Sequence, residues 1–281
     1  MISSYKLGTW ISRFFVYVLL FILLLIVIVP VWLLLVNGTR STAEINQGIS
    51  LLPSTHMLEN YNLLLAKGLN LPQGLLNSVI LATSSTLISV YFSFLTAYAL
   101  VVYSFRGRKQ ISNFIVVLTM IPMQLTILGF YKFMANLGLT DSYAPLLLPL
   151  IANAGGTFFS RQYLEAMVIQ DLIDAARIDG AGELRIFHEV MMPLAVPGMI
   201  TLGIFSFVGS WNNFFTPFIM LSTRSKFTLP MLVQLMRGDA YRTEYGAIYL
   251  GLGLTIVPVI IVYALASRYI ISGIAMGAIK E

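Results

Sequence analysis

Few side chains in this sequence have the types and spacing that catalysis requires. The chain has no cysteine, which excludes thiolate nucleophiles, disulfides and zinc–thiolate sites. Its two histidines, His56 and His188, lie in different loops, and neither belongs to an H-E-x-x-H motif. The sequence contains neither a G-x-S-x-G motif nor a G-x-x-x-x-G-K-[ST] phosphate-binding loop. These absences argue against an enzyme, and any ATP that drives this protein must be hydrolysed by another subunit.

Chemistry-bearing side chains concentrate in one segment, residues 165–189, which holds six of the twelve acidic residues. These six are Glu165, Asp171, Asp174, Asp179, Glu183 and Glu189. The surrounding loop 160–197 contains only three basic residues, Arg161, Arg177 and Arg185. Such a segment forms either a solvated pair of helices or a surface that docks a basic partner, and the sequence leaves both readings open.

The apolar residues of this segment recur every three or four positions, which predicts two short amphipathic helices. The first stripe consists of Leu164, Met167, Val168, Leu172, Ala175, Ala176 and Ile178, and the second of Leu184, Ile186, Phe187, Val190 and Met191. Gly180 interrupts the pattern at a point where a left-handed residue would end the first helix. Two helices joined at a glycine would project as a compact knob that fits a groove in a soluble protein.

The elements that must position this segment are membrane spans. Of the 281 residues, 58% are apolar and only 10% are charged, whereas a soluble domain carries about a quarter charged residues. Six charge-free stretches approach the roughly 20 residues that cross a bilayer. They are residues 14–36, 75–103, 111–131, 144–159, 198–221 and 247–267. Pro145 and Pro149 predict that the fourth stretch is bent or partly non-helical.

Basic residues predict the orientation of these spans. Arg106, Arg108 and Lys109 form a tight loop between the second and third spans, which makes that side cytoplasmic. With six spans, both termini share this side. We therefore expect a cytoplasmic N-terminus over 1–13, a six-span domain over 14–271 that includes the cytoplasmic loop 160–197, and a cytoplasmic tail over 272–281. Because the net charge of +5 is scattered over short loops, nucleic acid is not an expected partner.

The six predicted spans contain no Asp, Glu, Lys, Arg or His, which argues against ion-coupled transport. Contacts to a neutral solute would come from uncharged polar side chains in the spans. The candidates are Asn77, Gln124, Asn153, Ser210, Asn212 and Asn213, with Trp211 as an aromatic neighbour. Each polar candidate could equally make an interhelical hydrogen bond, and Trp211 could be a packing residue.

At residues 174–181 the sequence reads D-A-A-R-I-D-G-A. With the prolines downstream, this run resembles the E-A-A-x-x-D-G-A…P signature of the permease subunits of ABC importers. Asp174 stands in place of the usual glutamate, which keeps the charge but shortens the side chain by one methylene. Three further segments are similar to the maltose-permease-like branch, which takes up carbohydrates: Leu52 to Tyr61, the W-N-N-F run at 211–214, and the tail from Gly273 to Lys280.

The resemblance implies an all-α membrane fold with six transmembrane helices and a coupling helix in the cytoplasmic loop, in a bacterial or archaeal cytoplasmic membrane. It implies a second permease, two P-loop ATPases that hold ATP and Mg, and an extracytoplasmic binding protein that delivers a sugar or oligosaccharide. No cofactor or metal is implied for this chain. The residues implied for ATPase coupling are Asp174, Ala175, Ala176, Asp179, Gly180, Ala181, Phe187 and Pro193.

Alternative functions remain open at this point. The chain could serve an importer of a polyol, a glycerophosphodiester or a uronate oligomer, although spans without Arg or Lys favour a neutral solute. From a different class, it could be a channel or a membrane scaffold without an ATPase. The outer loop 222–246 corresponds by position to the loop that reaches into the binding protein in maltose-like permeases. Lys226, Gln234, Arg237 and Asp239 are candidate contacts there, although a solvated loop would explain them equally well, and no single residue is assigned.

Overall fold

The computed structural model describes residues 2–66, 70–167, 170–236 and 244–278, and these residues form helices and no strand. The chain divides into two compact units. The first is built from Met1–Leu69 and Leu235–Ile256, and the second from Asn70–Gln234 and Val257–Glu281. Helices suit a chain that crosses lipid, because each helix satisfies its own backbone hydrogen bonds. The predicted all-α fold is confirmed for the described residues.

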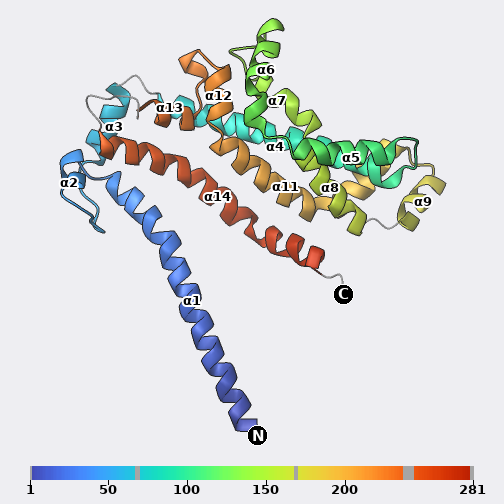
Figure 1. Ribbon diagram of the computed structural model, residues 1–281, viewed down its shortest axis with the longest axis horizontal. Coiled ribbons are helices and arrows are strands. Elements are labelled where there is room, and N and C mark those ends of the chain that lie inside the picture. Colours follow the sequence, from blue (N-terminus) through green and yellow to red (C-terminus); the bar gives the residue numbers. More distant parts are fainter. Residues whose placement is uncertain (1, 67–69, 168–169, 237–243, 279–281) are drawn as a thin grey trace. The chain divides into compact units, whose positions relative to one another are not determined.

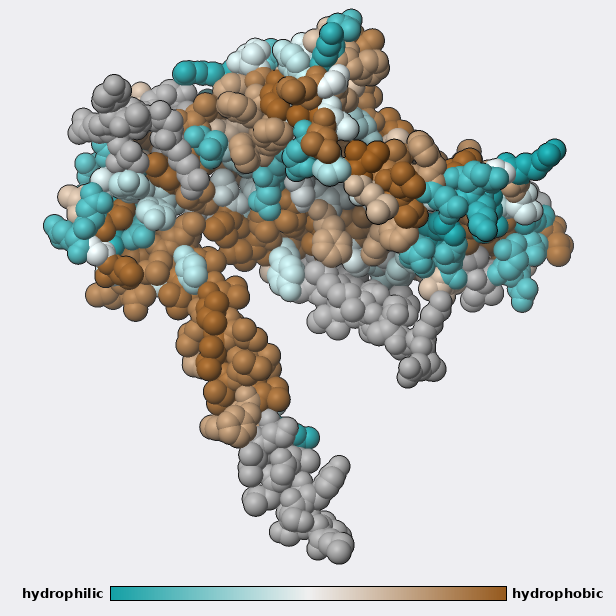
Figure 2. Space-filling view, in the orientation of Figure 1, coloured by the Kyte–Doolittle hydropathy of each residue, from teal (hydrophilic) through white to brown (hydrophobic). Residues whose placement is uncertain are grey.

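The first unit begins with the long helix α1 (Ile2–Asn37). It continues with α2 (Thr42–Asn46), α3 (Met57–Ala66) and the first turns of α14 (Tyr245–Ala278). From Phe14 to Val29 the side chains of α1 are apolar and exposed on every side, and Figure 2 shows this apolar surface. A helix that is apolar all round is suited to a membrane rather than to water.

Polar side chains hold the turn that follows α1. The buried guanidinium of Arg40 donates to Oδ1 of Asn37 at 3.1 Å and to the carbonyl oxygen of Gly48 at 3.0 Å. The amide of Asn60 donates to the Arg40 carbonyl oxygen at 2.9 Å. Gly246 of α14 lies against the same carbonyl oxygen, with no room for a Cβ. Backbone and side chains are thus tightly packed at this turn.

The second unit is organised around α4 (Leu71–Val102). Helices α8 (Ala154–Met167) and α11 (Met192–Asn212) pack against it, as Figure 1 shows. Asn70 caps α4 by accepting from the backbone N–H of Gln73 at 3.1 Å. The core of this unit includes the fully buried side chains of Phe94, Ile186 and Phe187.

Shorter elements connect these three helices. Between α4 and α8 lie α5 (Arg108–Thr119), α6 (Met123–Asn136), α7 (Ala144–Leu147) and the 3₁₀ turn η1 (Leu148–Ala152). Between α8 and α11 lie α9 (Gln170–Ile178), α10 (Glu183–Ile186) and the π-helical turn η2 (Phe187–Met191). After α11 come α12 (Phe215–Met220), the 3₁₀ turn η3 (Arg224–Lys226) and α13 (Leu229–Met236).

The expected count of six spans is not confirmed. Within the described residues, four helical segments are long and apolar enough to cross a membrane: Arg13–Asn37, Leu71–Val102, Glu183–Asn212 and Tyr245–Leu265. The pair Arg108–Thr119 and Gln124–Asn136 makes a fifth candidate, bent by 104°. The expected span 144–159 is not one helix, because α7, η1 and α8 divide it. Pro145 and Pro149 lack the N–H that a continuous helix needs, so the predicted break is confirmed.

Candidate functional site

The segment between α8 and α11 turns at a glycine, as the sequence predicts. Gly180 has φ +81°, in the left-handed region, two residues after the end of α9 at Ile178. The N–H of Gly180 donates to the Arg177 carbonyl oxygen and the N–H of Ala181 to the Ala176 carbonyl oxygen, both at 3.0 Å. This pair of bonds is the Schellman arrangement, which satisfies the last carbonyl groups of a helix. The two predicted helices, α9 and α10, are therefore joined at Gly180.

The buried face of α9 differs from the predicted stripe. Ile173 is completely buried and Ala176 is half-buried, whereas Leu172, Ala175 and Ile178 are exposed. On α9 the predicted stripe is therefore right only at Ala176 and misses Ile173, whereas its first residue, Leu164 of α8, is buried as predicted. Val168 lies outside the described residues. Spacings of three and four fit two adjacent faces of a short helix, and only packing against the rest of the protein selects one of them.

The exposed face of this segment carries large apolar side chains. Ile178 is 87% exposed and Leu184 is 65% exposed, beside the exposed carboxylate of Asp179. Figure 2 shows hydrophilic side chains gathered at the end of the second unit where α9 and the loop before α5 lie. Exposed apolar side chains rimmed by charges are typical of a protein-binding surface.

The eight predicted coupling residues fall into three environments. Ala175, Asp179, Gly180 and Pro193 are exposed, and the exposed carboxylate of Asp174 pairs with Arg177 Nη1 at 3.1 Å. Ala176 and Ala181 are half-buried. Phe187 is 1% exposed and packs against Tyr91 and Tyr98, so its side chain belongs to the core.

Glu183, one of the six acidic residues of the segment but not one of the predicted coupling residues, joins this segment to α4. Its oxygens accept from the hydroxyl of Tyr103 at 2.6 Å and the hydroxyl of Tyr98 at 3.0 Å. They also accept from Arg177, whose Nε lies at 2.8 Å and Nη2 at 3.4 Å. Hydrogen bonding to Glu183 raises the pKa of the Arg177 guanidinium. Pairs such as Arg177 and Glu183, six residues apart across a turn, carry no periodic signal in the sequence.

A small cavity of about 240 Å³ lies in the second unit, among α4, α7, η1, α11 and α12. Its lining combines apolar side chains with uncharged polar ones, and we refer to it as the polar cavity. Four serines line it in two facing pairs: Ser210 donates to Ser85 at 3.0 Å and Ser206 donates to Ser89 at 3.3 Å. The amide of Asn153 also donates to Ser89, at 2.7 Å. No charged side chain lines this cavity. Its hydroxyl and amide groups can donate and accept hydrogen bonds without attracting an ion.

The structure brings three of the seven predicted substrate-path residues to this polar cavity: Asn153, Ser210 and Asn213. Asn77 does not line it, and its amide donates to the carbonyl oxygens of Ser225 and Phe227 at 2.8 and 2.9 Å. Trp211 is 1% exposed and stacks on Phe207, with ring centroids 5.7 Å apart. Gln124 and Asn212 are exposed elsewhere.

Three of the serines at the polar cavity, Ser85, Ser89 and Ser206, were not among the candidates, although Ser210 was. The spacing of all four serines in the sequence could have identified them. Ser85 and Ser89 are four residues apart on α4, and Ser206 and Ser210 are four apart on α11. Residues at this spacing share one helix face. A serine pair on one face of each of two apolar spans therefore indicates a polar seam between them.

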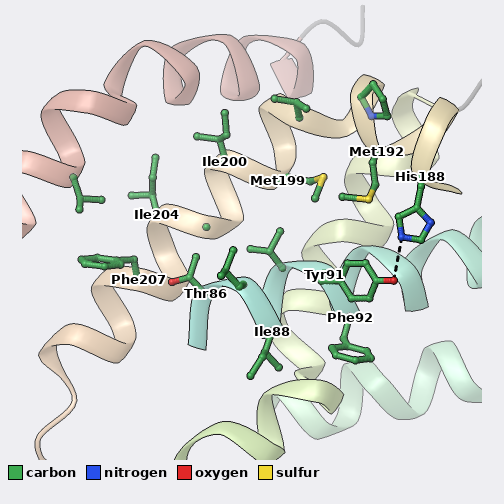
Figure 3. Close-up of a pocket in the computed structure, with 16 residues that line it drawn as sticks. Thr86, Ile88, Tyr91, Phe92, His188, Met192, Met199, Ile200, Ile204 and Phe207 are labelled. Atoms are coloured by element: carbon green, nitrogen blue, oxygen red, sulfur yellow. Dashed lines mark hydrogen bonds between the residues drawn. The ribbon is translucent and has the colours of Figure 1, made fainter. Parts of the chain in front are cut away.

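A larger cavity of about 1,070 Å³ lies along the contact of α4 and α11 (Figure 3). Most of its lining is apolar, including Ile200, Ile204 and Phe207. Polar groups lie at one end, where the Tyr91 hydroxyl lies 3.2 Å from Nε2 of His188. A polyhydroxylated solute would lose its hydrogen bonds to water here, so the smaller polar cavity fits such a solute better.

Asp141 holds the loop that follows α12, which the sequence predicts to lie on the outer side. Its carboxylate accepts from the hydroxyl of Thr223 at 2.5 Å, from the backbone N–H groups of Ser222 and Thr223, and from Lys226 Nζ at 3.1 Å. These bonds, that of the Thr223 hydroxyl first, hold the pKa of Asp141 well below its usual range. Of the four candidate contacts in this loop, Lys226 is thus engaged within the chain. Gln234 is exposed, and Arg237 and Asp239 lie outside the described residues.

Comparison with known proteins adds a family match. Residues 89–276 match the model of the family described as binding-protein-dependent transport system inner membrane component. The matched residues include α8, α9, α10 and α11, and thus the glycine turn, Glu183 and most of the polar cavity.

Relatives are similar over nearly their whole length. The arabinooligosaccharides transport system permease protein AraQ of Bacillus subtilis is 32% identical over 91% of this chain and 92% of its own. The sn-glycerol-3-phosphate transport system permease protein UgpE of Yersinia pestis is 30% identical over 92% of this chain and 95% of its own.

Among solved structures, that of a bacterial ABC transporter involved in the import of the acidic polysaccharide alginate aligns with a TM-score of 0.80. The identity is 24%, over 92% of this chain and 96% of that one. At this identity the alignment supports the fold, which is that of an ABC importer permease.

Proposed function

The chain belongs to the family of binding-protein-dependent transport system inner membrane components, and we propose that it carries neutral sugars or oligosaccharides across the membrane as one of two permeases. As a member of this family it is a membrane-embedded transport component of an ABC importer and not an enzyme. The solute, the partners and the orientation of the termini belong to the proposal.

The observation that carries the choice of solute is the uncharged polar cavity. Serine hydroxyls and the amides of Asn153 and Asn213 line it, and such groups match the hydroxyl groups of a saccharide. A phosphate or uronate would call for Arg or Lys in the lining. AraQ, whose name specifies arabinooligosaccharides, is consistent with this choice, whereas UgpE and the alginate transporter represent the anionic alternative.

The proposal assigns energy supply to other subunits. Two P-loop ATPases hold ATP and Mg, and a solute-binding protein delivers the sugar on the outer side. The exposed face around Ile178, Leu184 and Asp179 docks one ATPase on the cytoplasmic side, where both termini also lie. Closure of the ATPases then moves the docked segment as a rigid body.

Transport assays test this function. The chain is co-expressed with its neighbouring permease, ATPase and binding-protein genes, reconstituted into proteoliposomes and supplied with labelled arabinotriose, maltotriose, glycerol 3-phosphate or a uronate oligomer. We expect ATP-dependent uptake of a neutral saccharide and none of the anions. Uptake of only an anion would overturn the choice of solute. Proteoliposomes that contain this chain alone should neither hydrolyse ATP nor accumulate sugar along a proton or sodium gradient, and accumulation there would overturn the ABC mechanism.

Neutralising Asp174 and Asp179 together, as Asp174→Asn with Asp179→Asn, is expected to weaken ATPase co-purification and to slow uptake. Exposed ion pairs contribute little, so each single change should weaken assembly by about fivefold or less. Since Asp174 already pairs with Arg177, the greater effect is expected at Asp179. The measurement is the amount of ATPase retained per permease on an affinity column.

A matched control removes two other carboxylates from the same segment. Glu165→Gln with Glu189→Gln breaks the pairs with Arg161 and Arg185, both at 2.7 Å, and leaves the glycine turn intact. This control should retain the ATPase. In a double-mutant cycle, replacing a basic residue in the ATPase groove should reduce ATPase binding less in the chain that carries Asp174→Asn and Asp179→Asn than in the unchanged chain. If the effects are strictly additive and co-purification is unchanged, the acidic cluster is a solvated surface and does not dock the ATPase.

A further inference from the structure

Glu183 hydrogen-bonds to α9 and to the end of α4 at the same time. On one side its carboxylate holds Arg177 of α9 with two hydrogen bonds. On the other side it holds Tyr98, in the last turn of α4, and Tyr103, the residue that caps this helix. The Arg177 guanidinium also lies over the Tyr103 ring, 6.0 Å from its centroid. One carboxylate thus ties three elements together.

Helix α4 runs from this carboxylate to the polar cavity. Tyr98 and Ser85 are thirteen residues apart on one uninterrupted helix, which corresponds to about 20 Å along its axis. Ser85 and Ser89 lie on the wall of the cavity, where they meet Ser210 and Ser206 of α11. A displacement of the cytoplasmic end of α4 along its axis therefore reaches the serine pairs, because a packed helix moves as a rigid element.

Apolar packing alone would transmit such a displacement less directly. Phe187 contacts Tyr98 with ring centroids 5.5 Å apart, but apolar contacts have no preferred direction and allow surfaces to slide. Hydrogen bonds to a carboxylate are short and directional, and those with an ionised partner are about twice as strong as neutral ones. The geometry of Glu183 is therefore suited to fix the distance between α9 and α4.

We propose that Glu183 is a positioning residue that transmits movement of the docked segment, through Tyr98 and Tyr103, to α4 and the serine pairs of the polar cavity. The inference rests on the proposed function, since it requires an ATPase that moves α9. It adds a defined mechanical link between the docking surface and the polar cavity. The residue acts through the two tyrosines and does not contact the solute.

The absence of cysteine in this chain permits a direct test. A single Ser85→Cys reporter is placed in the polar cavity, and the whole transporter is prepared in membrane vesicles. The measurement is the rate at which N-ethylmaleimide modifies this chain, with and without MgATP. The test variant adds Tyr98→Phe and Tyr103→Phe, which removes both hydroxyls and leaves the Arg177–Glu183 pair in place.

With the tyrosines present, MgATP should change the modification rate by at least about fivefold, the lower end of usual coupling between two sites. In the double Phe variant this change should disappear while the complex still hydrolyses ATP. Glu183→Ala should have the same effect, and combining it with the double Phe variant should add nothing, because the three residues act as one unit. The control Glu189→Ala removes an exposed carboxylate from η2 and should keep the full change.

The outcomes separate this inference from the proposed function. If the double Phe variant keeps its ATP-dependent change, Glu183 is not the link, although the importer function stands. If ATP hydrolysis and the change in labelling are lost together, the tyrosines support the structure only, and the inference also fails. If no ATPase co-purifies with the chain that carries only the reporter, it is the proposed function that fails.

Discussion

Replacing Gly180 with valine is expected to abolish ATP-dependent uptake by the assembled transporter while the chain still inserts into the membrane. Gly180 has φ +81° at the turn between α9 and α10, where a β-branched residue is strongly disfavoured. A Cβ at this position would meet no atom within 4 Å, so the effect comes from the backbone and not from a clash. Valine would unwind the Schellman turn and displace Ile178 and Leu184 from the docking surface. Uptake of labelled saccharide and the amount of chain in the membrane fraction are the two measurements.

The matched control at this turn is Gly180→Asn, since asparagine adopts the left-handed region more readily than other residues. It should retain most of the uptake, and Gly180→Ala should fall between the two variants. A Gly180→Val chain that transports normally at normal expression would refute the assignment of the coupling segment. Equal losses in all three variants would indicate that space at Gly180, and not its conformation, is what the site requires.

The second large effect is expected at the start of α14, where Gly246→Ala should strongly reduce the stability and membrane level of the protein. A Cβ on Gly246 would overlap the backbone carbonyl oxygen of Arg40 and would lie 2.7 Å from the amide of Asn60. A backbone oxygen has no rotamer into which to move, so the turn after α1 would have to shift. Overpacking of this kind usually costs about 1–3 kcal/mol, and we expect the upper end. The thermal unfolding midpoint of the detergent-solubilised transporter measures the loss.

Gly129→Ala in α6 is the control for this substitution, since no atom lies within 4 Å of a Cβ there. Alanine is favoured over glycine inside a helix by roughly 0.5–1 kcal/mol, so this variant should be neutral or slightly more stable. If Gly246→Ala were as stable as Gly129→Ala, the close approach of α14 to the Arg40 carbonyl would not exist in the folded protein.

The membrane-spanning helices and the glycine turn of this protein could be predicted from its sequence, because both depend on local residue chemistry. Low charge together with long apolar runs predicted membrane-spanning helices, because lipid permits few other structures for a single chain. The glycine turn was predictable as well, since Gly180 interrupts a periodic pattern and its freedom at positive φ is a property of the residue itself. Pro145 and Pro149 likewise predicted the break between α7 and α8.

Other features depended on packing between distant segments, and the tertiary structure alone decided them. Ile173 is buried in place of Leu172, because the core of the second unit determines which face of α9 turns inward. Asn77 and Asn153 are both uncharged amides in apolar spans, yet one holds the outer loop and the other lines the polar cavity. Glu183 meets Tyr98 and Tyr103 across about 80 residues of sequence, with distances of 3.0 and 2.6 Å. Hydrogen-bond partners so far apart in the chain leave no periodic signal in the sequence. Residue type and composition therefore determined the helices and the glycine turn. The pairing of side chains followed only from how the helices pack.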